Sequence, residues 1–152
     1  MNQRTESDEW LMGQVRKGCR SSLEKLVRRY ASPLLTFIER TVGDRHRAEE
    51  LFQEVFLSVW SKRRQYKLEH AFRSWLFTIA ANRCRSHFRK QVTPTISPEI
   101  VDSSPDRATS ATATAIATET AAMVTVAVKQ LPPAQRMVVS LRVWNGMSFA
   151  EI

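Results

Sequence analysis

The stretch Ser61–Lys90, SKRRQYKLEHAFRSWLFTIAANRCRSHFRK, dominates the charge and the helix pattern of the chain. It holds nine Lys and Arg residues against one acid, Glu69, and this balance of +8 equals the net charge of the whole 152-residue chain. Five aromatic side chains are interleaved with the cations: Tyr66, Phe72, Trp75, Phe77 and Phe88. Cations interleaved with flat rings suit a polyanion that also offers faces for stacking. The stretch therefore predicts a surface for a nucleic acid with unpaired bases.

The same stretch divides into a loop and a helix. Gln65–His70 has weak helix character and separates two strong helical patterns, so we expect a loop there. Ala71–Lys90 is expected to form a helix with one buried side. Its other side carries a polar stripe at spacings of four, three and four residues, consisting of Thr78, Asn82, Arg85 and Arg89. Long cations beside an amide suit phosphate contacts combined with hydrogen bonds to base edges, although an ordinary solvated basic face would show the same pattern.

The helix expected just before this stretch, Arg45–Lys62, has two unlike faces. Its core-facing stripe consists of Ala48, Leu51, Phe52, Val55, Phe56 and Val59. The other face holds Glu50, Gln53, Leu57 and Trp60, so two large apolar groups lie beside an acid and an amide. This face either packs on a neighbouring helix or forms a partner-binding surface with an aromatic anchor and an acidic rim.

Two further helices are expected nearer the N-terminus. The first begins after Ser7 and ends at Gly18. The second is expected to be capped by Ser21 or Ser22 and to continue to Gly43. Pro33 lies inside it and should kink or briefly break the helix, because proline lacks the backbone N–H that the helix requires. Asp44 is expected to cap the helix that follows.

The composition changes abruptly after Lys90. Residues 91–118 are rich in Pro, Ser, Thr and Ala, which is typical of a mobile linker that splits the chain into two parts. Beyond the linker, we expect one helix ending at Gln130 and a second that starts at the two prolines after Leu131 and ends at Asn145-Gly146. Ser148 is expected to cap another helix. Because the sequence stops within its first turn, we expect the chain to be truncated.

The composition excludes several classes of protein. Four glycines, and the lack of alternating β-branched runs, favour an all-α fold over a sheet. Two distant cysteines form neither a disulfide framework nor a metal site, which favours a reducing, cytoplasmic location. No signal peptide or membrane-spanning run is found, and a membrane-surface role suits the basic helix less well than packing does. We also expect no metal, cofactor, small-molecule substrate or enzymatic activity, because the histidines lack ligand spacing and no phosphate loop occurs.

Four stretches, in this order, resemble an extracytoplasmic-function (group IV, sigma-70 family) sigma factor of bacterial RNA polymerase. They are LVRRYASPLLTFIERTVGD (26–44), AEELFQEVFLSVW (48–60), FRSWLFTIAANRCRSHFRK (72–90) and LPPAQRMVVSLRVWNGMSFAEI (131–152). The resemblance implies a four-helix sigma region-2 domain over 1–90, a flexible linker over 91–118 and an incomplete helix-turn-helix region-4 domain over 119–152. It also implies a transcription initiation factor that binds the polymerase core and recognises and melts the −10 promoter element.

The resemblance further implies roles for individual residues. The face of Glu50, Gln53, Glu54 and Leu57, together with Trp60, is expected to contact the clamp of the largest polymerase subunit. The loop stands where the family captures a base flipped out of the −10 element, and Asn82 falls on a promoter-contacting Asn. The full set of expected DNA contacts is Gln65, Tyr66, Lys67, His70, Arg73, Thr78, Asn82, Arg83, Arg85, Arg89 and Lys90. An anti-sigma factor is a further partner that the resemblance permits.

The chain departs from the family pattern in two places. The loop lacks the usual Asp- and Gly-rich composition, which leaves its base preference open. The helix that would read the −35 element is missing from the sequence, so we expect poor binding to that element. A second hypothesis is therefore a truncated decoy that occupies the polymerase core or an anti-sigma partner without initiating transcription. The reading frame after the codon of Ile152 would discriminate between the two.

Overall fold

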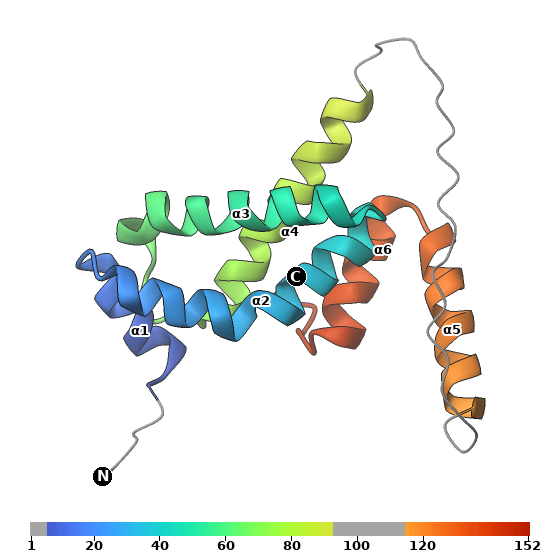
Figure 1. Cartoon of the computed structure of the whole chain (residues 1–152), viewed down its shortest axis with the longest axis horizontal. Helices are drawn as coiled ribbons and strands as arrows, with labels where there is room; N and C mark the ends of the chain where they lie inside the picture. The colour runs from blue at the N-terminus through green and yellow to red at the C-terminus, as the bar shows by residue number, and fades with distance from the viewer. Residues whose placement is uncertain (1–5, 93–114) are drawn as a thin grey trace.

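The computed structural model describes residues 6–92 and 115–152, and its described part is helical without strands, as the sequence predicts (Figure 1). The predicted linker residues 93–114 lie outside the described residues. The elements, in chain order, are α1 (Asp8–Arg16), α2 (Arg20–Val42), α3 (Arg45–Lys62), the 3-10 turn η1 (Arg63–Gln65), α4 (Phe72–Val92), α5 (Ala115–Gln130), α6 (Pro133–Val139) and the π-helical turn η2 (Ser140–Trp144). Helix α4 thus continues two residues past Lys90, and α5 begins four residues before Glu119.

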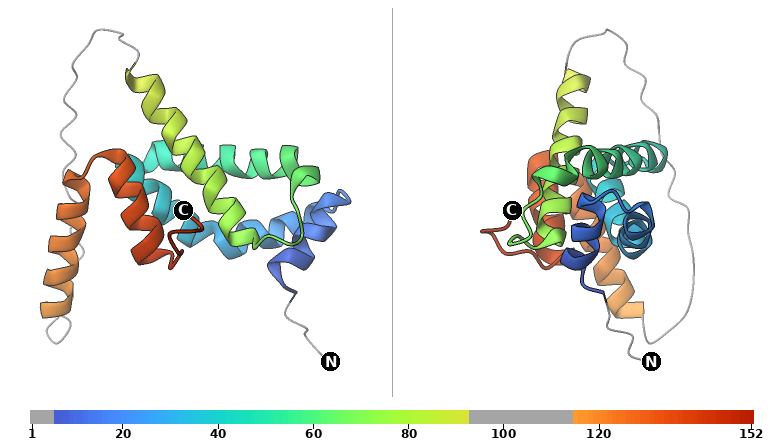
Figure 2. Two further views of the ribbon diagram at one scale, coloured as in Figure 1. Left: turned by 180° about the vertical axis from the view of Figure 1, so that it is seen from behind. Right: turned by 90° about the vertical axis from the view of Figure 1, so that its left-hand side faces the viewer.

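Helices α1 to α4 surround one apolar core. Figure 1 shows α3 lying along α2 with α4 crossing behind both of them, and Figure 2 shows α4 in front when the molecule is seen from behind. The predicted core stripe of α3 is buried, except that Phe52 is half-buried. At the centre, Phe37 of α2 meets Phe77 of α4 edge to face, with ring centroids 5.5 Å apart. Aromatic pairs in this geometry stabilise a core beyond the effect of their buried area alone.

The helix ends follow local capping chemistry. Ser7 accepts a hydrogen bond from the backbone N–H of Trp10 (3.1 Å), and Asp44 accepts one from Arg47 (2.9 Å), so both predicted caps are confirmed. Gly43 ends α2 with φ of 78°, a left-handed conformation that favours glycine. The prediction that Ser21 or Ser22 caps α2 is wrong, because Cys19 holds the N-cap position. The two serine hydroxyls instead lie 3.2 and 3.3 Å from the Cys19 sulfur.

Pro33 bends α2 but does not break it. The helix is continuous from Arg20 to Val42, and Figure 1 shows its second half rising at an angle toward α6. Proline cannot donate to the carbonyl four residues earlier, so the helix opens on that side. The predicted kink is confirmed and the predicted break is not found. The bend directs the C-terminal half of α2 toward the last part of the chain.

The last part of the chain packs on the first. Met137, Leu141 and Met147 are almost completely buried and belong to the same apolar core as α1 to α4. Helix α6 and η2 contact α2, and α6 also contacts α4. The helices predicted to end at Gln130 and before Asn145 are found, although the second widens into a π turn. The parts of the chain before and after the predicted linker therefore pack against each other.

Ser148 does not begin a helix within the described residues. Its backbone N–H and its hydroxyl both donate to the carboxylate of Glu151, each at 2.8 Å, and the segment forms a turn. Only half of a capping box is present, because the Ser148 hydroxyl donates to Glu151 while the Glu151 N–H donates to the Ser148 backbone carbonyl. None of the helices within 6–92 and 115–152 combines the length and the apolar character that spanning a bilayer requires.

Candidate docking and nucleic-acid surfaces

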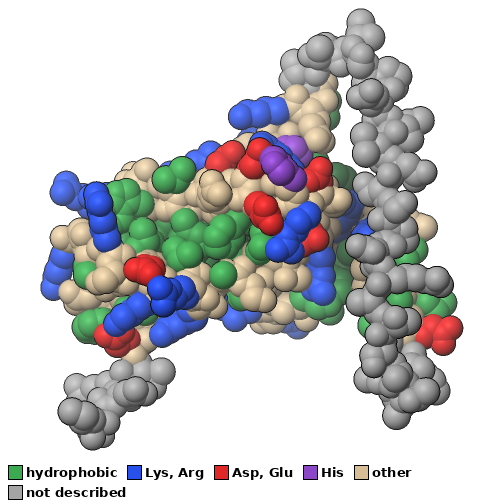
Figure 3. All heavy atoms as spheres, in the orientation of Figure 1, with side chains coloured by type: hydrophobic (Ala, Val, Ile, Leu, Met, Phe, Trp, Pro, Cys, Tyr) green, Lys and Arg blue, Asp and Glu red, His purple; other side chains and the backbone are tan. Residues whose placement is uncertain are grey.

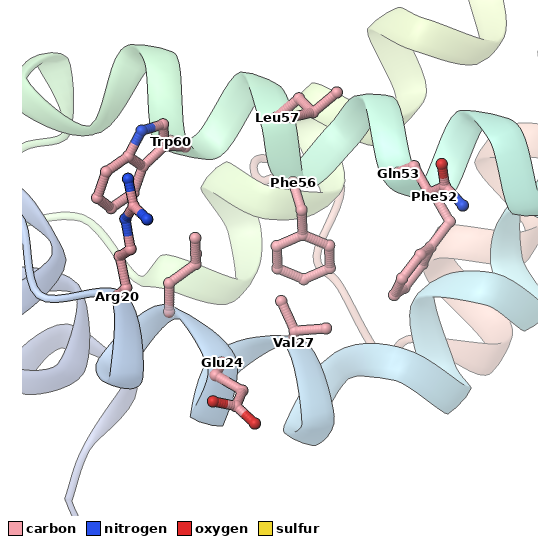
Figure 4. A pocket seen from close by; sticks show the side chains of 9 residues that line it. Arg20, Glu24, Val27, Phe52, Gln53, Phe56, Leu57 and Trp60 are labelled. Carbon is pink, nitrogen blue, oxygen red and sulfur yellow. The ribbon is translucent and has the colours of Figure 1, made fainter.

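The first candidate surface is an apolar groove between α2 and α3, which we call the docking groove. Its volume is about 610 Å³. Helix α2 contributes Arg20, Leu23, Glu24 and Val27, and α3 contributes Phe52, Gln53, Phe56, Leu57 and Trp60. Figure 3 shows the hydrophobic side chains gathered in a band between the two helices, and Figure 4 shows Phe52 and Phe56 pointing from α3 toward Val27. The groove is therefore a nonpolar surface open to solvent.

Leu57 and Trp60 differ in how the fold holds them. The Trp60 ring is partly covered, because the guanidinium carbon of Arg63 lies 4.2 Å from its centroid and that of Arg20 lies 5.9 Å away. Such cation–π contacts orient the indole beside the groove. Leu57 is 66% exposed, so packing on a neighbouring helix of the described chain does not account for it. A large apolar side chain displayed this way, beside an oriented indole, is typical of a protein-binding surface.

The predicted acids do not line the groove. Glu50 pairs with Arg47 and lies 3.6 Å from His46, and Glu54 lies 3.8 Å from the guanidinium of Arg83. Gln53, Leu57 and Trp60 are thus brought together, while the two glutamates stand outside the groove lining. The α2 wall, in contrast, was missed by the sequence reasoning. The sequence pattern of this wall is a spacing of four residues between Leu23 and Val27, beside the charged Arg20 and Glu24. An ordinary amphipathic helix shows the same pattern, so the pattern does not reveal a groove.

The second candidate surface is the polar stripe of α4, which we call the basic stripe. Thr78, Asn82, Arg85 and Arg89 are all exposed on this helix, as predicted. Arg85 donates to the side-chain oxygen of Asn82 at 2.8 Å, so an amide and a cation form one unit. Lys90 is also exposed at the end of the stripe. In Figure 2, seen from behind, α4 lies in front, on the side away from the docking groove of Figure 3.

Two of the residues expected to contact DNA, Tyr66 and Arg83, lie off the basic stripe and have protein partners. Tyr66 is 1% exposed, with its ring against Phe72 and Trp75 and its hydroxyl donating to the carbonyl of His70. Burial raises the pKa of Tyr66 to about 12, so it remains a neutral donor. Arg83 turns toward α3, where it donates to the Ser58 hydroxyl. Tyr66 therefore positions the loop, and Arg83 ties α4 to α3.

The loop between α3 and α4 exposes its remaining predicted residues. Gln65 ends η1, while Lys67 and His70 are exposed and linked by a backbone hydrogen bond of 3.0 Å. The loop leads directly into α4, whose first N–H, at Phe72, donates to the Glu9 carboxylate at 3.2 Å. A carboxylate from α1 thus satisfies one of the orphan donors at the start of α4. The loop therefore ends at the capped start of the helix that carries the basic stripe.

Arg73, the first cation of α4, is engaged by the C-terminal part of the chain. Its guanidinium donates to the backbone carbonyl of Asn145 at 2.7 Å. The next residue, Ser74, donates to the Glu151 carboxylate at 2.8 Å. Arg73, one of the residues expected to contact DNA, is exposed, and part of its hydrogen-bonding capacity is used by a protein carbonyl.

Three titratable groups have pKa values shifted by their surroundings. The hydroxyls of Ser21 and Ser22 lower the pKa of the Cys19 thiol to about 7, and burial raises that of Cys84 to about 12. Burial and the neighbouring Arg47 lower the pKa of His87, whose Nδ1 accepts from Arg47 at 3.1 Å. Within residues 6–92 and 115–152, no three His, Cys, Asp or Glu side chains are placed to hold a metal ion.

Comparison with known proteins points to one protein family. The family model Sigma-70 region 2 matches residues 26–93. The chain is 34% identical over 146 aligned residues to the RNA polymerase sigma factor CarQ of Myxococcus xanthus, covering 93% of this chain and 80% of that protein. It is 26% identical over 162 aligned residues to the RNA polymerase sigma-H factor of Pseudomonas aeruginosa, covering 97% and 81%.

Two further comparisons concern the subgroup and the fold. The ECF RNA polymerase sigma factor SigW of Bacillus subtilis is 28% identical over 78 aligned residues, covering 51% of this chain and 42% of that protein. A solved structure of CnrH, in complex with the cytosolic domain of CnrY, matches with a TM-score of 0.65 at 23% identity. That match covers 95% of this chain and 79% of CnrH, and it confirms the fold.

Proposed function

Because this chain belongs to the extracytoplasmic-function group of RNA polymerase sigma factors, which bind the polymerase core and promoter DNA to initiate transcription, we propose how its two surfaces divide that work. The docking groove binds the core, at the clamp of the largest subunit. The basic stripe and the loop recognise the −10 promoter element and hold it open. The observation that carries this proposal is the placement of an apolar groove and a cationic face on separate sides of one rigid four-helix bundle.

The docking groove suits an α-helical partner. It is apolar along its floor, open to solvent and bordered by Leu57 and Trp60, which supply the kind of anchor that dominates protein interfaces. Amphipathic helices commonly bind in such grooves through apolar residues at helical spacing. Arg20 and Glu24 on the opposite wall provide charges that fix the orientation of the partner.

The basic stripe supplies affinity and a small amount of sequence recognition. Arg85 and Arg89 neutralise phosphates, which releases counterions and favours any DNA. Asn82, held by Arg85, is suited to a base edge. Extruding a base costs a few kcal/mol, and a protein surface that stacks or encloses the base returns roughly 1–3 kcal/mol. We propose that the chain forms no covalent bonds itself and that the polymerase catalyses nucleotide addition.

The proposal includes a cytosolic location and a regulatory protein partner. CnrH was solved with the cytosolic domain of CnrY, which supports the idea that a protein such as an anti-sigma factor binds this chain. An exposed apolar groove is the surface that such a partner would compete for. The decoy hypothesis is not favoured, because the relatives described above are named as RNA polymerase sigma factors.

The docking assignment is tested by changing the rim of the groove. The double variant Gln53→Ala, Leu57→Ala should bind purified core polymerase about 30-fold more weakly, because truncating an interface anchor costs about 2 kcal/mol. Both side chains are exposed, so helicity measured by circular dichroism should not change. Glu49→Gln, an exposed change on the same helix outside the groove, is the matched control. Unchanged core affinity in the double variant would refute the assignment.

A further inference from the structure

A second hollow, which we call the α4–α6 cleft, lies between α4 and the turn that leads from α5 into α6. Helices α4 and α6 contact each other there (Figure 2). The cleft has a volume of about 550 Å³, which is in the range of pockets that hold small molecules. Helix α4 contributes Asn82, Arg85, Phe88 and Arg89 to its lining, and the other side contributes Pro132, Pro133, Ala134 and Met137. The two sides differ in chemistry, and this difference indicates the kind of ligand.

The side formed by the start of α6 is apolar. Its two consecutive prolines have no backbone N–H to donate, and Ala134 and Met137 carry apolar side chains. On the α4 side, Phe88 is half-buried and supplies the one aromatic ring among the described lining residues. A nucleobase would therefore find no second ring on which to stack. The lining suits an aliphatic chain better than a planar base.

One arginine holds the apolar side in place. The guanidinium of Arg136 donates to the carbonyls of Lys129 at 2.7 Å and Leu131 at 3.1 Å, which fixes the turn between α5 and α6. It also donates to the Thr41 carbonyl at 3.0 Å, which fixes the turn to the end of α2. Met137 is 2% exposed and packs in the common core. The wall is therefore preorganised, which reduces the conformational entropy that binding must cost.

The opposite edge of the cleft is cationic. Arg85 donates to the Asn82 side-chain oxygen at 2.8 Å, and Arg89 donates to the Ser86 hydroxyl at 3.2 Å. Within the described part of the chain, no carboxylate lies within ion-pair distance of either guanidinium. Both arginines are exposed, and each guanidinium has five N–H donors, so both keep donors for a ligand. A planar guanidinium pairs well with a carboxylate, often through two parallel hydrogen bonds.

We propose that the α4–α6 cleft binds a small amphipathic anion, with its aliphatic chain against the two prolines and Met137 and its carboxylate on Arg85 and Arg89. The charge of the cationic edge selects an anion over a cation. Because the cleft has two facing walls, the ligand is a free single-chain molecule and not a lipid within a bilayer. Binding at this site is independent of the proposed function. Its consequence for DNA rests on that function, because the ligand would occupy two arginines of the basic stripe.

Isothermal titration calorimetry of the full chain with decanoate, below its micellar concentration, tests the site. We expect one molecule to bind per chain with a Kd of about 10 μM to 1 mM, the range for a ligand of this size. Decyltrimethylammonium carries the same chain length with a positive head group, and it should bind at least about tenfold more weakly. Equal affinity for the two compounds would mean nonspecific adsorption to an apolar surface and would overturn the proposal.

Two variants locate the binding site. Arg85→Gln should weaken decanoate binding about tenfold, because it removes a charged donor, while Lys129→Gln removes an exposed cation outside the lining and should have no effect. Ala134→Glu places a carboxylate on the apolar wall, where it repels the ligand and should weaken binding by a similar factor. Ala134 is exposed in the first turn of α6, where an acid suits the helix dipole, so circular dichroism should be unchanged. If neither Arg85→Gln nor Ala134→Glu changes the affinity, decanoate binds elsewhere and the proposal is wrong.

A competition measurement separates failure of the site from failure of the DNA assignment. At ten times its Kd and at fixed ionic strength, decanoate should weaken binding of a short fluorescein-labelled duplex about tenfold, as measured by fluorescence anisotropy. If decanoate binds with the expected dependence on Arg85 and Ala134 but does not weaken duplex binding, the site is correct and the proposed role of the basic stripe is contradicted. If Arg85→Gln weakens duplex binding but decanoate does not bind the parent chain, the stripe is correct and the site is refuted.

Discussion

Asn82 and Arg89 lie on the same exposed face of α4, but we expect them to contribute differently to DNA binding. Asn82→Ala should reduce discrimination among −10 sequences by about 1–3 kcal/mol at the base that it contacts, because an amide pairs with a base edge. Arg89→Gln should weaken binding to all sequences and lower the slope of log affinity against log salt by about 0.9. Competition binding of the core-bound chain to a set of promoter oligonucleotides at several salt concentrations measures both effects.

Each variant should leave unchanged the property that the other variant alters. If Arg89→Gln changed the order of preferred sequences, or Asn82→Ala changed only the salt slope, the division between specificity and phosphate contact would be contradicted. Gln91→Ala, an exposed change two residues beyond the stripe, serves as the control for both. The comparison depends on salt being matched, since phosphate contacts dominate affinity at low ionic strength.

Individual residues show where sequence reasoning reaches its limit. The stripe Thr78, Asn82, Arg85 and Arg89 was predictable because helical periodicity fixes which residues share a face. Tyr66 was not, because an aromatic side chain in a polar loop can stack on a ligand or fill the core, and only packing decides. In this fold the Tyr66 side chain fills the core, where its ring packs against the rings of Phe72 and Trp75.

At the level of elements, the cap of α3 is expected to contribute measurably to stability. Asp44→Ala removes the oxygen that accepts from the Arg47 N–H, which should lower the free energy of unfolding by about 0.5–2 kcal/mol. Urea denaturation followed by circular dichroism measures the change. Asp44→Ser keeps a capping oxygen and should recover most of the loss. An Asp44→Ala chain as stable as the parent would show that tertiary packing alone holds the start of α3.

Most helix bounds followed from local signals, and the exceptions have local causes. Gly43 and Asp44 fixed the end of α2 and the start of α3, because each supplies a backbone or side-chain geometry that few residues provide. The start of α2 was misplaced by two or three residues, because Cys19 occupies the cap and the serines hydrogen-bond to its sulfur instead. The continuity of α2 through Pro33 depends on packing of both halves against the core, which no local rule contains.

For the whole molecule, the sequence indicated which faces are apolar but not what covers them. The proline-rich stretch predicted two separate parts, yet Met137 and Leu141 complete the core around α2 and α4. Amphipathic spacing predicts burial without naming the partner surface. For the same reason the docking groove was half predicted: its α3 rim was identified, while its α2 wall was not.

The central claim, that this chain directs polymerase to promoters through its two surfaces, is tested most directly by transcription. Core polymerase is incubated with the chain and a library of genomic fragments, and the 5′ ends of the transcripts are sequenced. We predict that the ends cluster at a limited set of sites sharing one −10-like motif, and that Gln53→Ala, Leu57→Ala abolishes this clustering while Glu49→Gln does not. Transcript ends distributed as they are with core polymerase alone would contradict the account.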